Sequence, residues 1–293
     1  MPVLKAYPSG LTLSRPHAGT PPTDTKRGRV VGWSTQAAAR HVAWLMSIDH
    51  DPLMRDAELW AYTLTVRDTP GSAKEFHALR RAWFMRLERA LPLASVTPLW
   101  CWVMEWQQRG TPHLHGVIVA PPGSGATVHA LVNIAWPDLA RSWGASSLGQ
   151  DVRRVDGAPG WFAYLAKHIG RGKGHAQRTG LPPGWQSSGR LWGHSEGWPT
   201  SEVVWEVDGA AFVQLRRLVH SWALADARSE RDPNVRRRRM VYLRRRRRQP
   251  AESSQFVGMR EWCPPEVFSR LMLWCASQGS ELVSRTTGEV LES

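Results

Sequence analysis

Hydrophobic and polar residues alternate with a period of two in several stretches of the chain. From Trp60 to Val66, apolar side chains alternate with smaller and polar ones, as in a half-buried strand. Two further apolar runs, Leu99 to Trp106 and Thr111 to Ala120, are separated by a short polar turn, and this pattern predicts a β-hairpin. A short edge strand is expected over Asp151 to Val155.

Apolar residues three and four positions apart predict helices between these strands. The clearest pattern runs from Ser72 to Leu91, a second from Thr127 to Trp143 is interrupted near Pro137, and a third covers Trp161 to Ile169. A short helix is also expected over Ala37 to Ile48. Helices between antiparallel strands predict an α+β fold, in which a central antiparallel sheet is flanked by helices.

The length of 293 residues allows one substantial core with appendages. Residues 1–55 are predicted to form a partly flexible N-terminal extension, because their first half is rich in Pro, Gly, Ser and Thr. The main domain is expected over 56–200. A strand and a helix at 201–230 are expected to pack on its core, with an arginine-rich segment and a C-terminal tail at 231–293.

The chain shows no apolar stretch of membrane-spanning length and no recognisable signal peptide. Its three cysteines are widely spaced and lack the paired spacing of a zinc site. We therefore expect a cytoplasmic protein with reduced thiols in its core.

Two histidines stand two positions apart at the start of the second hairpin strand, in His113-Leu114-His115. Positions i and i+2 of a strand share a face, so both imidazoles project from one side of the sheet. If Glu105 pairs opposite His113 across the hairpin, Val103 falls opposite His115 and the carboxylate joins that face. The pattern predicts a divalent metal site with Glu105, His113 and His115 as ligands. A chance His-x-His triplet is the alternative.

The helix expected over Trp161 to Ile169 presents a tyrosine beside cationic side chains. Tyr164, Lys167, His168 and Arg171 fall on one stripe at helical spacing. A phenol beside ammonium and guanidinium groups is the arrangement that attack of a tyrosine on a phosphodiester requires. The alternative is a surface tyrosine packed beside solvated cations.

The formal net charge of +13 and the pI of about 10.7 favour a polyanionic partner. Two arginine runs, Arg236 to Arg239 and Arg244 to Arg248, form a block that is expected to repel itself and stay solvated until a polyanion binds it. A merely solubilising tail is the alternative. The chain has no Gly-x-x-x-x-Gly-Lys-Ser/Thr motif, so no ATP-driven helicase domain is expected.

Four motifs follow one another along the chain: the strand Tyr62 to Arg67, then Glu105 with His113-Leu114-His115, then Tyr164-x-x-Lys167, and then Gly189 to Gly193. The first three, in this order, resemble the three motifs of HUH endonucleases, and the fourth resembles a stretch that follows the tyrosine in many plasmid and phage initiators. The closer resemblance is to rolling-circle replication initiators of plasmid and phage type with a single catalytic tyrosine.

This resemblance implies a five-stranded sheet with the histidines at its centre and a bound Mg²⁺ or Mn²⁺ ion. It also implies nicking and rejoining of single-stranded DNA through a 5′-phosphotyrosyl intermediate on Tyr164, with Lys167 lowering the pKa of the phenol or holding the phosphate. Termination would use His168 or the Tyr164 of a second protomer. The expected partners are single-stranded DNA or an origin hairpin, a host helicase and polymerase, and a transient second copy of the chain, without a membrane.

Candidate DNA contacts are polar and cationic residues near these motifs and in the arginine block: Thr63, Thr65, Arg67, Arg109, Arg171, Lys173, Arg190, Arg236, Arg237, Arg238, Arg239, Arg244, Arg245, Arg246, Arg247 and Arg248. Relaxases and single-strand transposases share the fold and chemistry and are alternatives within the class. A non-catalytic nucleic-acid-binding module, whose sheet stacks aromatic residues on bases, is the alternative from another class.

Overall fold

The computed structural model describes residues 1–14, 29–91, 98–156, 158–169, 181–248 and 258–292. The side chains of residues 35, 158, 159, 164, 167–169 and 245–248 lie outside that description. The chain forms two compact units. We call Asp24–Leu45 with Asp49–Pro199 the central unit, and Met1–Thr23 with Met46–Ile48 and Thr200–Ser293 the terminal unit.

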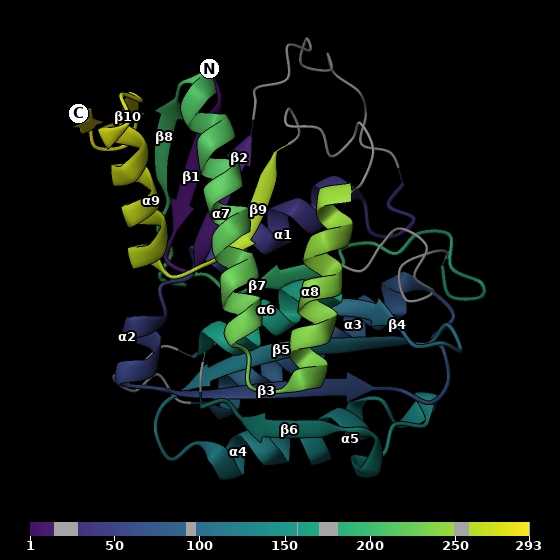
Figure 1. The fold of residues 1–293 in the computed structure, drawn as a ribbon. Coiled ribbons are helices and arrows are strands. Elements are labelled where there is room, and N and C mark those ends of the chain that lie inside the picture. Colours follow the sequence, from purple (N-terminus) through teal and green to yellow (C-terminus); the bar gives the residue numbers. More distant parts are fainter. Residues whose placement is uncertain (15–28, 92–97, 157, 170–180, 249–257, 293) are drawn as a thin grey trace. The chain divides into compact units, whose positions relative to one another are not determined.

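The central unit is built on a five-stranded antiparallel sheet, which confirms the predicted fold class (Figure 1). The strand that carries both histidines is the middle one. The strand order is β6 (Asp151–Arg154), β3 (Glu58–Thr65), β5 (Pro112–Ala120), β4 (Leu99–Trp106) and β7 (Trp192–His194). Of these, β7 was not predicted, because it is short and lies in a Gly- and Trp-rich stretch that reads as loop.

One face of this sheet is filled by large apolar side chains that pack against α3 (Ala73–Ala90). The helix begins at the N-cap Ser72, whose hydroxyl accepts a hydrogen bond from the backbone of Glu75. Trp83 of α3 is fully buried, and its indole donates to the carbonyl of Leu131 (3.0 Å). The face of the sheet that carries Tyr62 is therefore committed to the hydrophobic core.

The predicted interruption near Pro137 is present, and it has a local cause. The segment divides into α4 (Gly125–Ala130), a π-helical turn (Leu131–Ala135), α5 (Trp136–Leu139) and a 3₁₀ turn (Arg141–Trp143). Proline has no N–H to donate and its ring crowds the carbonyl one turn earlier, so a regular α-helix cannot continue through this position.

The other described helices of the central unit are shorter than α3. They are α1 (Thr35–Ser47), which ends in the terminal unit, α2 (His50–Arg55), a 3₁₀ turn (Ser147–Gly149) and α6 (Ala158–Ile169). In α6, Phe162 and Leu165 are buried, as their helical spacing predicted. The ring of Phe162 stacks on His50 of α2, with 5.1 Å between the ring centroids.

The terminal unit carries a second antiparallel sheet that the sequence patterns did not predict. Its strand order is β11 (Val290–Leu291), β10 (Leu282–Ser284), β8 (Val203–Val207), β1 (Val3–Tyr7), β2 (Gly10–Ser14) and β9 (Met259–Trp262). Residues 3–14 are thus strands rather than a flexible extension, and the residues after 258 contribute three more strands rather than a tail.

Two helices, α7 (Gly209–Ser229) and α9 (Pro265–Ser277), share a hydrophobic core with this second sheet. Leu4 and Leu13 of the sheet are buried with Phe212 of α7 and Phe268 of α9. A strand and a helix do lie within 201–230, and the core that they help to form belongs to the terminal unit.

The arginine block forms a helix, α8 (Pro233–Arg248), packed on α7 rather than a solvated run. Leu243 of α8 is 4% exposed and packs with Ala223 and Ala227 of α7. Arg239 forms ion pairs with Asp226 and Glu230. Burial of Leu243 and neutralisation of Arg239 offset the mutual repulsion of the arginines and allow the helix to form.

All three cysteines are free and buried, as expected for core thiols. Burial raises the pKa of Cys101 to about 12, so this thiol is held in its neutral form. Among the described residues, no helix is long and apolar enough to cross a membrane.

A glycine at the centre of β5, Gly116, leaves room for the Tyr62 side chain of β3 to reach across to β4. A Cβ atom on Gly116 would collide with the Tyr62 ring and the Cys101 carbonyl, which are joined by a hydrogen bond from the phenol (3.0 Å). We expect Gly116→Ala to lower the free energy of unfolding by about 1–3 kcal/mol in urea denaturation. Gly160→Ala is the control, because nothing lies within 4 Å of its Cβ position. Equal stability of the two variants would contradict this account.

Candidate metal centre

The β4–β5 hairpin has the predicted register. Glu105 lies opposite His113, and Val103 lies opposite His115. Because side chains alternate along both strands, Glu105, His113 and His115 all project from the face opposite Tyr62 and Trp102. The polar turn between the strands closes with a hydrogen bond from the Gln107 N–H to the Thr111 carbonyl (2.8 Å).

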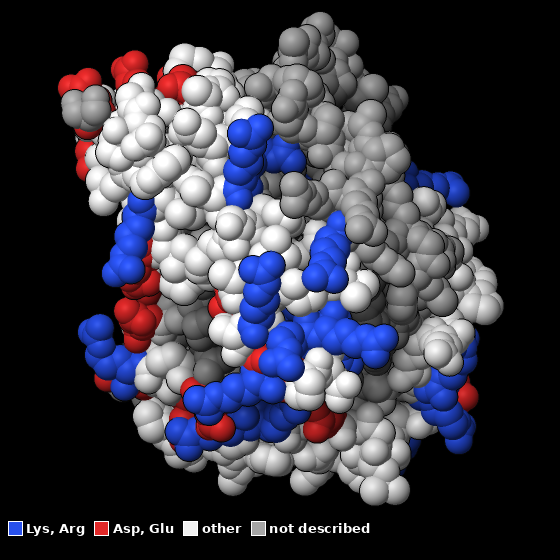
Figure 2. All heavy atoms as spheres, viewed as in Figure 1, with Lys and Arg blue, Asp and Glu red and all other residues white. Residues whose placement is uncertain are grey.

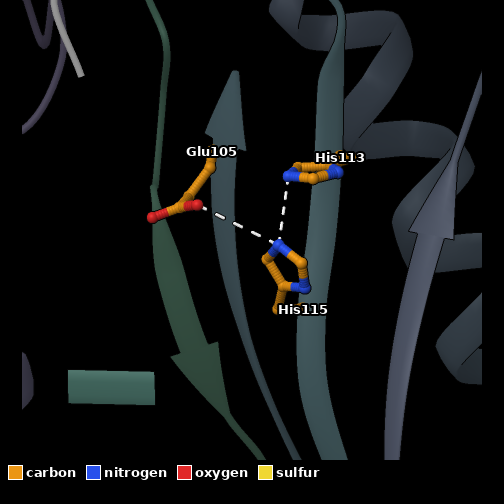
Figure 3. Close-up of side chains that lie close together, drawn as sticks. All are labelled: Glu105, His113 and His115. Atoms are coloured by element: carbon orange, nitrogen blue, oxygen red, sulfur yellow. Dashed lines mark hydrogen bonds and ion pairs between the residues drawn. The ribbon is translucent and has the colours of Figure 1, made fainter. Parts of the chain in front are cut away.

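The three side chains point toward one another at the turn end of the hairpin (Figure 3). The Nε2 atom of His115 lies 3.1 Å from His113 Nε2 and 3.9 Å from Glu105 Oε2. One ligand atom from each residue lies within 4.8 Å of the other two. Glu105 is 1% exposed and His113 is 9% exposed, so the group is largely shielded from solvent.

This donor set fits a divalent ion. Ligand atoms that share an ion at about 2.1 Å lie at most about 4.2 Å apart, so the two measured separations are compatible with a common ion. Two imidazole nitrogens and one carboxylate oxygen suit divalent transition ions such as Mn²⁺. Glu105, His113 and His115 are thus the described residues that would hold the predicted metal.

A hydroxyl from the neighbouring strand orients one of the histidines. Thr63 of β3 lies opposite His115, and its Oγ1 atom is 3.0 Å from His115 Nδ1. When His115 Nε2 binds a metal through its lone pair, Nδ1 carries the proton and donates to Thr63. The Thr63 hydroxyl, expected to contact DNA, is therefore bonded to a candidate ligand. The sequence showed that Thr63 lies on the polar side of an alternating strand. It did not show how β3 pairs with β5, so the contact between Thr63 and His115 could not be predicted.

Several other candidate DNA contacts have intramolecular partners. The Thr65 hydroxyl donates to the carbonyl of Gly149, and Arg67 forms an exposed ion pair with Asp68 that lowers the pKa of this carboxyl. Arg109 donates to the carbonyl of Val66 (2.8 Å) and to a threonine hydroxyl, so it ties the hairpin turn to the end of β3. Arg190 is exposed.

The backbone of α6 carries Tyr164, Lys167 and His168 on one helix, as predicted. Their side chains are outside the described part of the structure, as are the whole residues Arg171 and Lys173. The position of these five residues relative to the metal ligands therefore stays a prediction.

The other three tyrosines of the chain differ in exposure. Tyr62 is 1% exposed, and burial raises the pKa of its phenol well above 10. Tyr7 is also buried, and its pKa is raised to about 12. Tyr242 on α8 is 63% exposed. Two of the four tyrosines are therefore held as neutral phenols inside the protein.

An antiparallel sheet with a carboxylate and two imidazoles on its central hairpin gives an α+β protein with a candidate metal centre, and comparison with known proteins specifies the family. The sequence model of the family "Replication-associated protein ORF2/G2P" matches residues 59–173, which include the whole candidate centre and α6.

Full-length relatives agree with this match. The chain is 38% identical over 291 residues to "Replication-associated protein G2P" of Pseudomonas phage Pf3, covering 97% of this chain and 100% of the relative. It is also 38% identical over 295 residues to a "Putative replication protein" of Xylella fastidiosa strain 9a5c, covering 94% and 96% of the two chains. No solved structure matches the chain. The chain belongs to the replication-associated protein ORF2/G2P family.

Removal of the Thr63 hydroxyl should weaken metal binding without removing a ligand. In Thr63→Val the proton on His115 Nδ1 loses its acceptor, and we expect Mn²⁺ affinity to fall by about 10- to 100-fold in isothermal titration calorimetry. Thr63→Ser keeps the hydroxyl and should bind Mn²⁺ nearly as tightly as the unmodified protein. Equal affinity of the Val and Ser variants would show that the hydrogen bond does not orient the imidazole.

Proposed function

We propose that this replication-associated protein initiates rolling-circle replication by nicking and rejoining single-stranded DNA at an origin. The observation that carries the proposal is the cluster of Glu105, His113 and His115 on the central hairpin of the segment that matches the family. A bound divalent ion there would polarise a non-bridging phosphate oxygen and stabilise negative charge on the leaving oxygen.

In this proposal Tyr164 is the nucleophile. Its phenol oxygen attacks the phosphorus, a new oxygen–phosphorus bond forms, and the bond from phosphorus to the 3′ oxygen breaks. The phenol proton is lost and the departing 3′ oxygen gains a proton, so one phosphodiester replaces another and no ATP is consumed. Lys167, one turn along α6, would favour the phenolate by its positive charge.

The burial of two of the other three tyrosines supports this assignment. Tyr7 and Tyr62 are buried phenols with raised pKa values, so neither can reach a phosphodiester without unfolding of its surroundings. Tyr242 is exposed but lies in the terminal unit. Tyr164 lies in the same unit as the metal ligands, on a helix that begins four residues after β6.

Tyr164→Phe removes the attacking oxygen and tests this chemistry. With a single-stranded DNA library and Mn²⁺, we expect the covalent protein–DNA adduct to disappear and cleavage to fall by at least about a hundredfold. His113→Ala should also abolish cleavage. Both variants should bind DNA as the unmodified protein does, because phosphate contacts elsewhere supply most of the affinity.

Tyr242→Phe is the matched control, since it removes an exposed phenol and should leave the adduct intact. Peptide mapping of the trapped adduct identifies the modified residue directly. An adduct on Tyr242, or undiminished cleavage by His113→Ala in EDTA, would refute the proposed mechanism.

We further propose that α8 supplies sequence-independent affinity for DNA. Figure 2 shows lysine and arginine side chains gathered over this helix. Arg237, Arg238 and Arg244 are exposed, and none of them forms an ion pair with a described carboxylate. Arg239, by contrast, is neutralised by Asp226 and Glu230. The helix therefore presents uncompensated positive charge that is suited to phosphates.

Substitution is the appropriate test of α8, because deleting the C-terminal region would remove strands β9 to β11. In Arg237→Gln/Arg238→Gln/Arg244→Gln, the slope of log affinity for single-stranded DNA against log salt should become shallower by about 2. Arg285→Gln is the control, since this arginine is paired with Glu206. An unchanged slope in the triple variant would exclude α8 from the interface.

A further inference from the structure

The stretch Gly189 to Gly193 leads into the edge strand β7, and packing explains several of its residues. Gly189 has φ +61°, and a Cβ atom there would collide with the imidazole of His77. Leu191 is 4% exposed in the core, and a Cβ atom on Gly193 would lie 2.9 Å from the indole nitrogen of Trp102. Packing does not explain the exposed Arg190.

Arg190 belongs to a group of arginines beside β7. Arg80 of α3 lies over the Trp102 ring, 3.7 Å from its centroid, and donates to His77 Nδ1 (2.9 Å). His77 in turn donates from Nε2 to the carbonyl of Ser188 (2.9 Å), so both of its nitrogens are occupied and the ring is neutral. This network fixes the position of Arg80 next to the start of the Gly189 stretch.

The charge of this group is uncompensated. Neither Arg80, Arg81 nor Arg190 forms an ion pair with any described carboxylate. Burial, together with the nearby positive charges of Arg190 and Arg81, lowers the pKa of Arg80 to about 10. Arg81 and Arg190 are exposed. Three neighbouring guanidinium groups without an acid repel one another within the protein. They are well suited to bind a phosphate, which would neutralise their charge.

The other face of β7 carries flat aromatic rings. Trp44 of α1 stacks on His194, with 4.3 Å between centroids and 6° between planes, and lies 5.9 Å from Trp192. The buried His41 supports Trp192 from 4.7 Å. His194 is exposed, and Trp44 and Trp192 are partly exposed. Trp192 lies opposite Val103, so these rings occupy the face of the metal ligands.

We propose that the β7 edge is a binding surface for single-stranded DNA, with bases stacking on Trp44 and His194 and phosphates held by Arg81 and Arg190. A flat aromatic pair on one face of the edge strand, with acid-free arginines beside the other face, matches unpaired bases joined by phosphates, the combination typical of single-strand binding surfaces. An acidic protein segment would pair with the arginines but would give the exposed rings no stacking partner. In duplex DNA the faces of the bases are stacked on one another and are not available to the rings. This inference rests on the proposed function, and it assigns the DNA strand a path beside the centre.

The test is fluorescence anisotropy with a labelled oligothymidine in EDTA, so that binding is measured without cleavage. His194→Ala should weaken binding by about fivefold or more, whereas His194→Phe keeps a flat ring and should retain it. In Arg81→Gln/Arg190→Gln the salt slope should become shallower by about 1.4. Arg86→Gln/Arg141→Gln removes the same charge from two arginines paired with Asp138 and should change neither quantity.

We call His194→Ala and Arg81→Gln/Arg190→Gln the edge variants. Unchanged affinity for the oligothymidine in both of them would refute the proposed binding surface. An equal loss of affinity for duplex DNA of the same length would also refute it, because it would exclude stacking of bases on the rings. Equal binding by His194→Ala and His194→Phe would also exclude it. The adduct assay separates the two proposals. An adduct formed by the unmodified protein together with unaltered binding by the edge variants refutes only the surface. Weakened binding by the edge variants without any adduct refutes only the nicking chemistry.

Discussion

The candidate centre depends on the register of one antiparallel strand pair. Glu105 lies opposite His113, and a slip of a single residue would move the carboxylate to the opposite face of the sheet, away from both imidazoles. The Tyr62 hydroxyl opposes such a slip, because it reaches across β5 at Gly116 to bond the carbonyl of Cys101 on β4. The candidate metal ligands therefore depend on packing on the other face of the sheet.

Hydrogen bonds and ion pairs within the protein separate the arginines that hold the fold from those available to a partner. Arg109 ties the hairpin turn to β3, and Arg239 joins α8 to α7. Arg81, Arg190 and Arg237 are exposed without an acid among the described residues. The net charge of +13 includes both the arginines that are bonded within the protein and those that are not. The distribution of unpaired cations, rather than the total, indicates where phosphates would bind.

Local patterns predicted most of the central unit, and contacts between distant residues account for what they missed. The hairpin register followed from strand alternation and one short turn. The role of Thr63 did not, because it depends on pairing between residues 52 positions apart. In the same way, β1 joins β8 across about 200 residues, and a local reading treated it as an extension. In α8 the charge obscured Leu243, the residue that anchors the helix on α7.

The two faces of the central sheet differ in what their side chains do: one packs in the hydrophobic core and the other carries the candidate ligands. Tyr62 and Trp102 fill one face with the core, which leaves the other for the ligands. On that second face Trp192, Val103, His115 and Thr63 lie in one row across β7, β4, β5 and β3. Trp192 and His115 are two strand spacings apart, roughly 10 Å. A DNA strand that follows this row would pass directly from the aromatic edge to the metal ligands. The alternation that brings the histidines together thus also aligns the β7 aromatic rings with them.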